Sequence, residues 1–157
     1  MTGKVASLHL HPEKGGEPLR DVDTIEVVQE KGIVGNGRYF GRVKKETGEP
    51  SRRQVSLIER EQLAAHASAL GKSIEPGQVR SNIETTGVDL VSLVGKHVRI
   101  GTAELFLYDT RDPCGKMDAV VPGLRERMMH GRQGVMARVT KSGSIRVGDA
   151  ITQCEEG

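Results

Sequence analysis

The residue best suited to chemistry in this chain is the cysteine at position 114. It lies in residues 109–117 (DTRDPCGKM), directly after an alternating apolar run and among turn-forming residues. A thiol in such a turn is accessible to solvent or to a ligand, whereas structural cysteines prefer apolar faces. The cations of Arg111 and Lys116 favour a thiolate, and two nearby aspartates oppose them. Two interpretations stay open for Cys114: a nucleophile, sulfur carrier or metal ligand, and a merely buried cysteine.

Residues 76–82 (PGQVRSN) form a second candidate site. A Pro-Gly turn precedes Arg80 and Asn82, and strand alternation predicts that these two side chains share one face. A guanidinium matches phosphate oxygens, and an amide offers donors and acceptors to the edge of a heterocycle. The alternative is an exposed arginine and an asparagine that only caps a turn.

The remaining thiol and the histidines give weaker signals. Cys154, next to two glutamates, is either an unimportant tail thiol or a resolving thiol for Cys114. His9 and His11 alternate on a predicted strand and are expected to share one face, but the other histidines are scattered. The sequence has neither a zinc-binding pattern nor the Gly-x-Ser-x-Gly motif of hydrolases. We therefore expect neither a zinc site nor a serine hydrolase.

Charge and hydropathy bear on the partners of this chain. Its 157 residues include 23 lysines and arginines against 21 aspartates and glutamates, a formal net charge of +2. So small an excess does not predict nucleic-acid binding. Two cysteines are too few for a disulfide scaffold, and the N-terminal residues lack the apolar core of a signal peptide. No stretch approaches the ~18 apolar residues of a membrane helix, so we expect a soluble, cytoplasmic protein.

Short strands and few helices must position these residues. A helix is expected at residues 59–70, ended by Gly71, and a shorter one at residues 122–130, with Pro122 in its first position. Residues 135–140 and 144–147 predict a hairpin. Further strands are expected at residues 4–10, 24–29, 54–58, 82–86, 97–100, 103–108 and 148–152.

Glycine and charge mark the segments between these strands. Three glycines within residues 32–38 require positive φ or a close backbone approach, and residues 40–53 predict an exposed loop. Composition does not shift along the chain, which indicates a single domain over residues 1–157. Many short strands with one longer and one short helix predict a mainly β fold, a barrel or a sandwich.

An ordered set of segments carries a family resemblance. None is specific alone, but they follow one another over a core of about residues 20–152. The segments are 32–38 (GIVGNGR), 53–58 (RQVSLI), 80–83 (RSNI), 89–95 (DLVSLVG), 99–101 (RIG), 113–114 (PC), 131–134 (GRQG) and 143–149 (GSIRVGD). In this order they resemble the MOSC domain, the module shared by molybdenum-cofactor sulfurases and related proteins. The resemblance implies a mainly β domain built around an irregular closed β-barrel.

The resemblance also implies a site. The family's cysteine falls at Cys114, where it carries sulfur as a persulfide or ligates the molybdenum of the molybdenum cofactor (molybdopterin). Arg80 and Asn82 match the residues expected to meet the pterin or its phosphate, Arg53 and Ser56 match the preceding strand, and Lys116 follows the cysteine. The late glycine motif of residues 131–134 could be a structural turn. One departure is Asn36, because family members commonly carry Asp there.

Three functions follow from this implied site. The first is a molybdenum-dependent oxidoreductase that reduces small N-hydroxylated compounds with electrons from an electron-transfer protein, because the chain shows no flavin or iron–sulfur motif. The second is a sulfur transferase in which Cys114 accepts persulfide sulfur from a pyridoxal-phosphate-dependent cysteine desulfurase. The chain has no pyridoxal phosphate domain of its own. The third is a non-catalytic module that binds the cofactor and presents it to other proteins.

Overall fold

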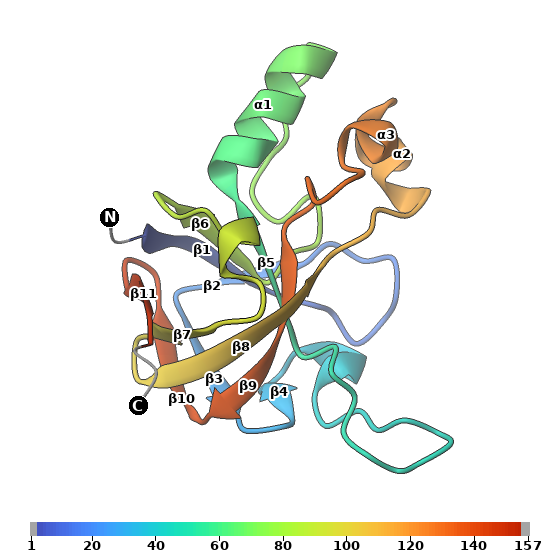
Figure 1. Ribbon diagram of the computed structural model, residues 1–157. Helices are drawn as coiled ribbons and strands as arrows, with labels where there is room; N and C mark the ends of the chain where they lie inside the picture. The colour runs from blue at the N-terminus through green and yellow to red at the C-terminus, as the bar shows by residue number, and fades with distance from the viewer. Residues whose placement is uncertain (1–2, 155–157) are drawn as a thin grey trace.

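Seven strands close into a barrel that organises the molecule (Figure 1). The computed structural model describes residues 3–154. Around the barrel the order is β11-β7-β8-β9-β5-β6-β1, and β11 pairs again with β1 to complete the circle. Only β5 and β6 run parallel among these neighbours. The strands are β1 (Gly3–Leu10), β5 (Val55–Glu59), β6 (Ile83–Thr86), β7 (His97–Ile100), β8 (Ala103–Thr110), β9 (Val135–Lys141) and β11 (Ala150–Gln153).

Smaller elements surround the barrel. Strand β2 (Arg20–Val22) extends the sheet beyond β1, and a separate sheet has the order β10-β3-β4. The other strands are β3 (Thr24–Val28), β4 (Gly32–Ile33) and β10 (Gly143–Arg146). The helices are η1 (Gly37–Tyr39), α1 (Arg60–Leu70), η2 (Val91–Leu93), α2 (Lys116–Val120) and α3 (Leu124–Arg127). None of the helices between residues 3 and 154 has the length and apolar character that crossing a bilayer requires.

Alternation in the sequence explains the barrel interior. In β8 and β9 every second residue is buried, which gives each strand one apolar face. The buried core of the barrel is aliphatic throughout, as expected for a chain without tryptophan and with two phenylalanines. The mainly β fold and the closed barrel predicted from the sequence are therefore confirmed.

The main helix is also confirmed. Strand β5 leads directly into α1, and Gly71 ends the helix in the left-handed conformation (φ 65°) with its N–H bonded to the carbonyl of Ala67. Helices α1, α2 and α3 enclose a second apolar cluster, which includes Leu63, Met117 and Leu124. In Figure 1 these three helices lie at one end of the barrel.

Two sequence predictions of secondary structure need correction. The helix expected at residues 122–130 is present only as the shorter α3 (Leu124–Arg127), and α2 (Lys116–Val120) precedes it where no helix was predicted. Gly123 separates them with φ 89°, a left-handed conformation that no continuous helix adopts. The hairpin expected between β9 and β10 does not form, because other groups already bond to the backbone of β9. Strand β8 pairs along one edge, β5 pairs with residues 135–137 on the other edge, and Val139 on that edge bonds to the side chain of Gln54 and the N–H of Glu30. Strand β10 pairs with β3 instead, with Ile145 opposite Ile25.

Gly134 fixes the approach of β9 to β5 and gives a stability prediction. Its φ is 80°, and a Cβ added there would overlap the backbone oxygen of Leu57 and crowd Ile58. We expect Gly134→Ala to lower the free energy of unfolding by about 3 kcal/mol, combining steric overlap with left-handed strain. Gly48→Ala is the matched control, because Gly48 also has positive φ (72°) but faces open space. Urea denaturation should show a loss of only about 1 kcal/mol for the control; equal losses would contradict the packing argument.

Candidate functional site

A pocket lies where several strand ends and loops meet beside β5. Its walls come from the segment after β1, the glycine-rich segment around η1, the start of β5, the residue before β6, the segment after β8, and β9. The barrel thus brings together residues that lie far apart in the sequence. The lining residues are His11, Asn36, Tyr39, Arg53, Gln54, Val55, Ser56, Asn82, Arg111 and Met136.

Asn82 is the hub of the pocket wall. Its Oδ1 accepts hydrogen bonds from the backbone N–H and the hydroxyl of Ser56, at 3.1 and 3.2 Å. Its Nδ2 donates to the carbonyl of His9 and to Oδ1 of Asn36, both at 3.0 Å. The backbone N–H of Asn82 donates to the hydroxyl of Ser56 at 3.0 Å. Both donors and both acceptor positions of the amide are therefore used within the protein, so Asn82 positions the wall.

A stability measurement separates this positioning role from direct ligand contact. Asn82→Ala leaves buried partners on β1, β5 and the segment of Asn36 without hydrogen bonds. We expect it to lower the free energy of unfolding by about 2–4 kcal/mol, since each buried unsatisfied group costs about 1–3 kcal/mol. Thermal and urea denaturation provide the measurement. A variant as stable as the unmodified protein, but unable to bind ligand, would instead make Asn82 a ligand residue.

Asn36 holds the opposite wall. This buried side chain accepts the backbone N–H of His11 at 2.8 Å through the same Oδ1 that Asn82 contacts. Asn36 lies between two of the glycines for which the sequence predicted positive φ. Their φ angles are 80° at Gly35 and 58° at Gly37. A Cβ at Gly37 would overlap the carbonyl of Pro12, so the segment can pack against β1 only with glycine there. The prediction of positive φ in residues 32–38 is confirmed.

Arg111 brings a half-buried positive charge to the pocket. Burial lowers the pKa of its guanidinium. Its Nη1 donates to the hydroxyl of Ser81 at 3.1 Å and to the carbonyl of Arg80 at 3.5 Å, both of which are neutral. Within residues 3–154, neither Arg111 nor Arg53 forms an ion pair with a carboxylate. Partial burial of a cation without an anionic partner costs free energy, so this arrangement favours an anionic ligand.

Arg80 does not share a strand face with Asn82, and that expectation was wrong. Its φ is 65°, a left-handed conformation that interrupts the extended chain before β6 begins at Ile83. Its Nη1 donates to the carbonyl of Glu17 at 2.9 Å. The turn nevertheless directs the carbonyl of Arg80 toward Arg111. The positive charge of Arg80 also lowers the pKa of His11 in the pocket.

The arginines shift two further groups in the pocket. The pKa of His11 falls to about 4, chiefly through burial and then through the charges of Arg80, Arg111 and Arg38. Burial alone would raise the pKa of Tyr39, but the hydrogen bond and charge of Arg38, with Arg53 and Arg111, outweigh it and lower that pKa. Because its pKa is about 4, His11 is neutral near pH 7. The centroid of its ring lies 4.7 Å from that of Tyr39. The pocket is positive and prepared for negative charge.

Cys114 is exposed in the loop between β8 and α2, at the rim of this charged region. The interpretation of Cys114 as a buried residue is therefore wrong. A charge interaction with Cys114 opposes the larger effect of burial on the pKa of Arg111, so the two side chains lie within electrostatic range of each other. Cys114 is not itself among the residues that line the pocket. Lys116 is exposed at the start of α2 and is not among the lining residues. Of the residues singled out from the sequence, Arg53, Ser56 and Asn82 line the pocket.

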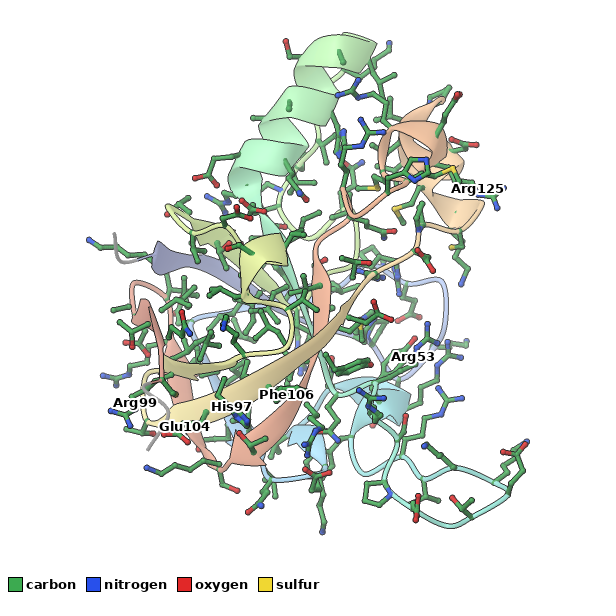
Figure 2. All side chains as sticks on the ribbon, viewed as in Figure 1. Arg53, His97, Arg99, Glu104, Phe106 and Arg125 are labelled. Atoms are coloured by element: carbon green, nitrogen blue, oxygen red, sulfur yellow. The ribbon has the colours of Figure 1, made fainter. Side chains whose placement is uncertain are left out.

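Cys154 lies at the other end of β8. Its backbone N–H donates to the carbonyl of His97 at 2.9 Å, and burial, followed by the charge of Glu104, raises the pKa of its thiol. Figure 2 shows His97 and Glu104 well away from Arg53. A strand rises about 3.3 Å per residue, so the six residues from Glu104 to the end of β8 span roughly 20 Å. This geometry separates Cys154 from Cys114 and gives no support to a resolving thiol.

His9 belongs to a separate polar cluster outside the pocket. It lies between Ser7 and Asp21, each 2.7 Å from a ring nitrogen, and 3.5 Å from the buried carboxylate of Glu84. Glu84 also accepts the backbone N–H of Gly77, which fixes the turn that leads to Arg80. His9 is 1% exposed, so it anchors this turn and is closed to a substrate. His11 lies beyond the end of β1 and lines the pocket, so the two histidines have separate roles.

The sequence patterns do not identify three ionisable residues of the pocket. They indicate Arg111 only as a neighbour of the thiol, and His11 only as part of a metal pattern that is absent. Tyr39 lies in the glycine-rich segment but was not singled out. One signal was present for Arg111, which precedes Pro113 and Cys114 directly after a long apolar strand.

The whole chain has relatives of known fold. A family model described as MOSC domain matches residues 15–152. The fold is similar to the YuaD protein from Bacillus subtilis, with a TM-score of 0.80 and 22% identity over 99% of this chain and 98% of that one. It is also similar to YiiM from Geobacillus stearothermophilus, with a TM-score of 0.75 and 18% identity over 99% and 76% of the two chains. YiiM from Escherichia coli gives a TM-score of 0.69 and 18% identity over 100% and 71%. No curated protein sequence matches this chain.

Proposed function

The chain belongs to the MOSC domain family, which is associated with the molybdenum cofactor, and we propose that it binds this cofactor through Cys114 and the adjacent arginine-lined pocket. The observation that carries the proposal is Arg111, a half-buried cation with no carboxylate partner within residues 3–154, which lies within electrostatic range of the exposed thiol of Cys114. An anionic cofactor supplies the missing charge, and a thiolate is a soft ligand suited to molybdenum.

The residues present fit such a group. Arg111 and Arg53 offer guanidinium forks for phosphate oxygens, and Arg80 adds positive charge from the neighbouring turn. Asn82 and Ser56, whose polar atoms bond to each other, hold the wall from which these cations project. Lys116, exposed two residues after Cys114, is proposed to contribute charge outside the pocket. When bound, the cofactor supplies two-electron redox chemistry at molybdenum.

We extend the proposal to the reduction of small N-hydroxylated compounds. In this function an electron-transfer protein delivers the electrons. The chain's own contribution is to hold the cofactor's negative charge with Arg53 and Arg111 and to keep His11 neutral beside it, because burial and the arginines lower the pKa of His11 to about 4. A cofactor-binding module without catalysis would use the same residues.

The exposure of Cys114 favours one alternative function. An exposed thiol at the rim of the pocket is reachable by a macromolecular donor, so Cys114 could accept persulfide sulfur from a cysteine desulfurase that uses pyridoxal phosphate. The positive surroundings would stabilise the persulfide anion. This alternative needs the thiol but does not need molybdenum.

Analysis of the purified protein tests the proposal. We expect molybdenum and a fluorescent pterin, each close to one per chain, in protein from a host that makes the cofactor. Protein from an otherwise identical host that cannot make it should contain neither. The absence of both from the first preparation would contradict the proposal. Sulfane sulfur on the protein after incubation with a cysteine desulfurase would then favour the sulfur carrier.

A further inference from the structure

We propose that the pocket is a receptor for a single tetrahedral oxyanion, such as phosphate, sulfate or molybdate, and that the side-chain amide of Asn36 determines its preference for anions. This inference rests on the pocket alone and does not require the cofactor. The oxyanion could be a free ion or the phosphate end of a larger molecule, since the chemistry of recognition is the same.

The size of the pocket fits one such group. Its volume is about 70 Å³. A water molecule needs roughly 10–15 Å³ by this measure, so there is room for a few water-sized groups. That volume accommodates a tetrahedral anion and leaves the remainder of a larger ligand outside.

The donors left free in the pocket suit an oxyanion. Within residues 3–154, both hydrogen bonds of the Arg111 guanidinium use Nη1, which leaves its other nitrogens for a ligand. Oδ1 of Asn36 already accepts two hydrogen bonds, so Nδ2 is the atom that Asn36 can offer. The hydroxyl of Tyr39 accepts a hydrogen bond from Arg38 at 3.3 Å and keeps its own proton to donate. None of the ten lining residues is an aspartate or a glutamate.

Substitution of Asn36 by aspartate should reverse the preference of the pocket for anions. An aspartate has the same shape and keeps an oxygen for the N–H of His11 and for Nδ2 of Asn82. Its second oxygen, however, replaces an N–H donor with negative charge in the pocket that Arg53 and Arg111 also line. The carboxylate would then occupy the cations that otherwise attract the ligand.

Calorimetric titration of the cofactor-free protein with inorganic phosphate, sulfate and molybdate tests the inference. We expect the unmodified protein to bind at least one of these ions, and Asn36→Asp to bind it at least tenfold more weakly at pH 7.5. Arg52→Ala is the matched control for lost positive charge, because exposed Arg52 stacks on Tyr108 outside the pocket. The control should bind as the unmodified protein does, and thermal unfolding should show that Asn36→Asp remains folded.

The pH dependence adds a readout that a structural role of Asn36 would not move. The pKa of Tyr39 is lowered, so its phenol ionises below the usual pH of about 10 and then repels an anion. Sulfate affinity should therefore fall as the pH rises through this range, and absorbance of the phenolate should show sulfate delaying the ionisation. Tyr39→Phe should remove this alkaline loss.

Several results decide the inference. It is overturned if the unmodified protein binds none of the three ions, or if Asn36→Asp binds them equally well. If the protein binds these ions but never contains molybdenum or pterin, this inference stands while the proposed cofactor function fails. If it retains the cofactor but binds no free ion, only this inference fails. Displacement of bound phosphate during cofactor loading would show that the cofactor's phosphate uses the same pocket.

Discussion

Cys114→Ser is expected to lose essentially all bound molybdenum while the protein remains folded. Serine has nearly the shape of cysteine, and the thiol is exposed, so little packing depends on the sulfur. A neutral hydroxyl is a poor ligand compared with a thiolate, because it would have to lose a proton with a far higher pKa. Part of the pterin should remain, since the arginine-lined pocket is intact.

Metal analysis and pterin fluorescence on the same preparations measure this effect. Cys154→Ser is the matched control, because Cys154 lies near Glu104 at the other end of β8. The control should retain both molybdenum and pterin. If Cys114→Ser also keeps its molybdenum, Cys114 is not the ligand, and the assignment of the metal site is wrong.

Arg111→Met is expected to weaken retention of the pterin about a hundredfold, because truncating one partner of a buried charge pair costs about 2–5 kcal/mol. Methionine can fill much of the space that the arginine side chain occupies. The same substitution removes a half-buried cation that has no carboxylate partner within residues 3–154. The cofactor-free variant should therefore be as stable as the unmodified protein or more stable.

This pair of effects distinguishes a ligand residue from a structural one. Binding is measured by pterin content after purification and by equilibrium titration, and stability by urea denaturation. Arg138→Met is the matched control, because Arg138 forms an ion pair with Glu30 at 2.8 Å and does not line the pocket. The control should keep the pterin. An Arg111→Met protein that unfolds easily would indicate that Arg111 acts mainly through Ser81 and Arg80 in the fold.

The fold could be predicted from the sequence where local pattern decides it. Alternation along residues 103–108 and 135–140 gave strands β8 and β9, and helix-forming residues ended by Gly71 gave α1. Pairing depends on which edges are free, and no local pattern carries that information. The predicted hairpin between β9 and β10 is wrong for this reason, because β8, β5, Gln54 and Glu30 already supply the hydrogen-bond partners of β9.

The candidate site could be predicted only in part. The ordered motifs led to Arg53, Ser56 and Asn82, which line one pocket, and to Cys114 beside it. The sequence could not reveal that the hydrogen bonds of Asn82 are already used within the protein. Arg111 is one of 23 lysines and arginines, and it is distinguished only by its half-buried position in the pocket wall without an ion pair among residues 3–154.

Alkylation of the two thiols, followed by mass spectrometry, tests the central claim most directly. Protein that contains molybdenum is treated with iodoacetamide, and Cys154 serves as the internal reference within the same chain. The proposal predicts that exposed Cys114 is protected while the cofactor is bound and becomes reactive once it is removed, with no change at Cys154. Rapid alkylation of Cys114 while molybdenum stays bound would contradict the proposal. A Cys114 peptide heavier by one sulfur atom, in protein without molybdenum, would instead identify a sulfur carrier.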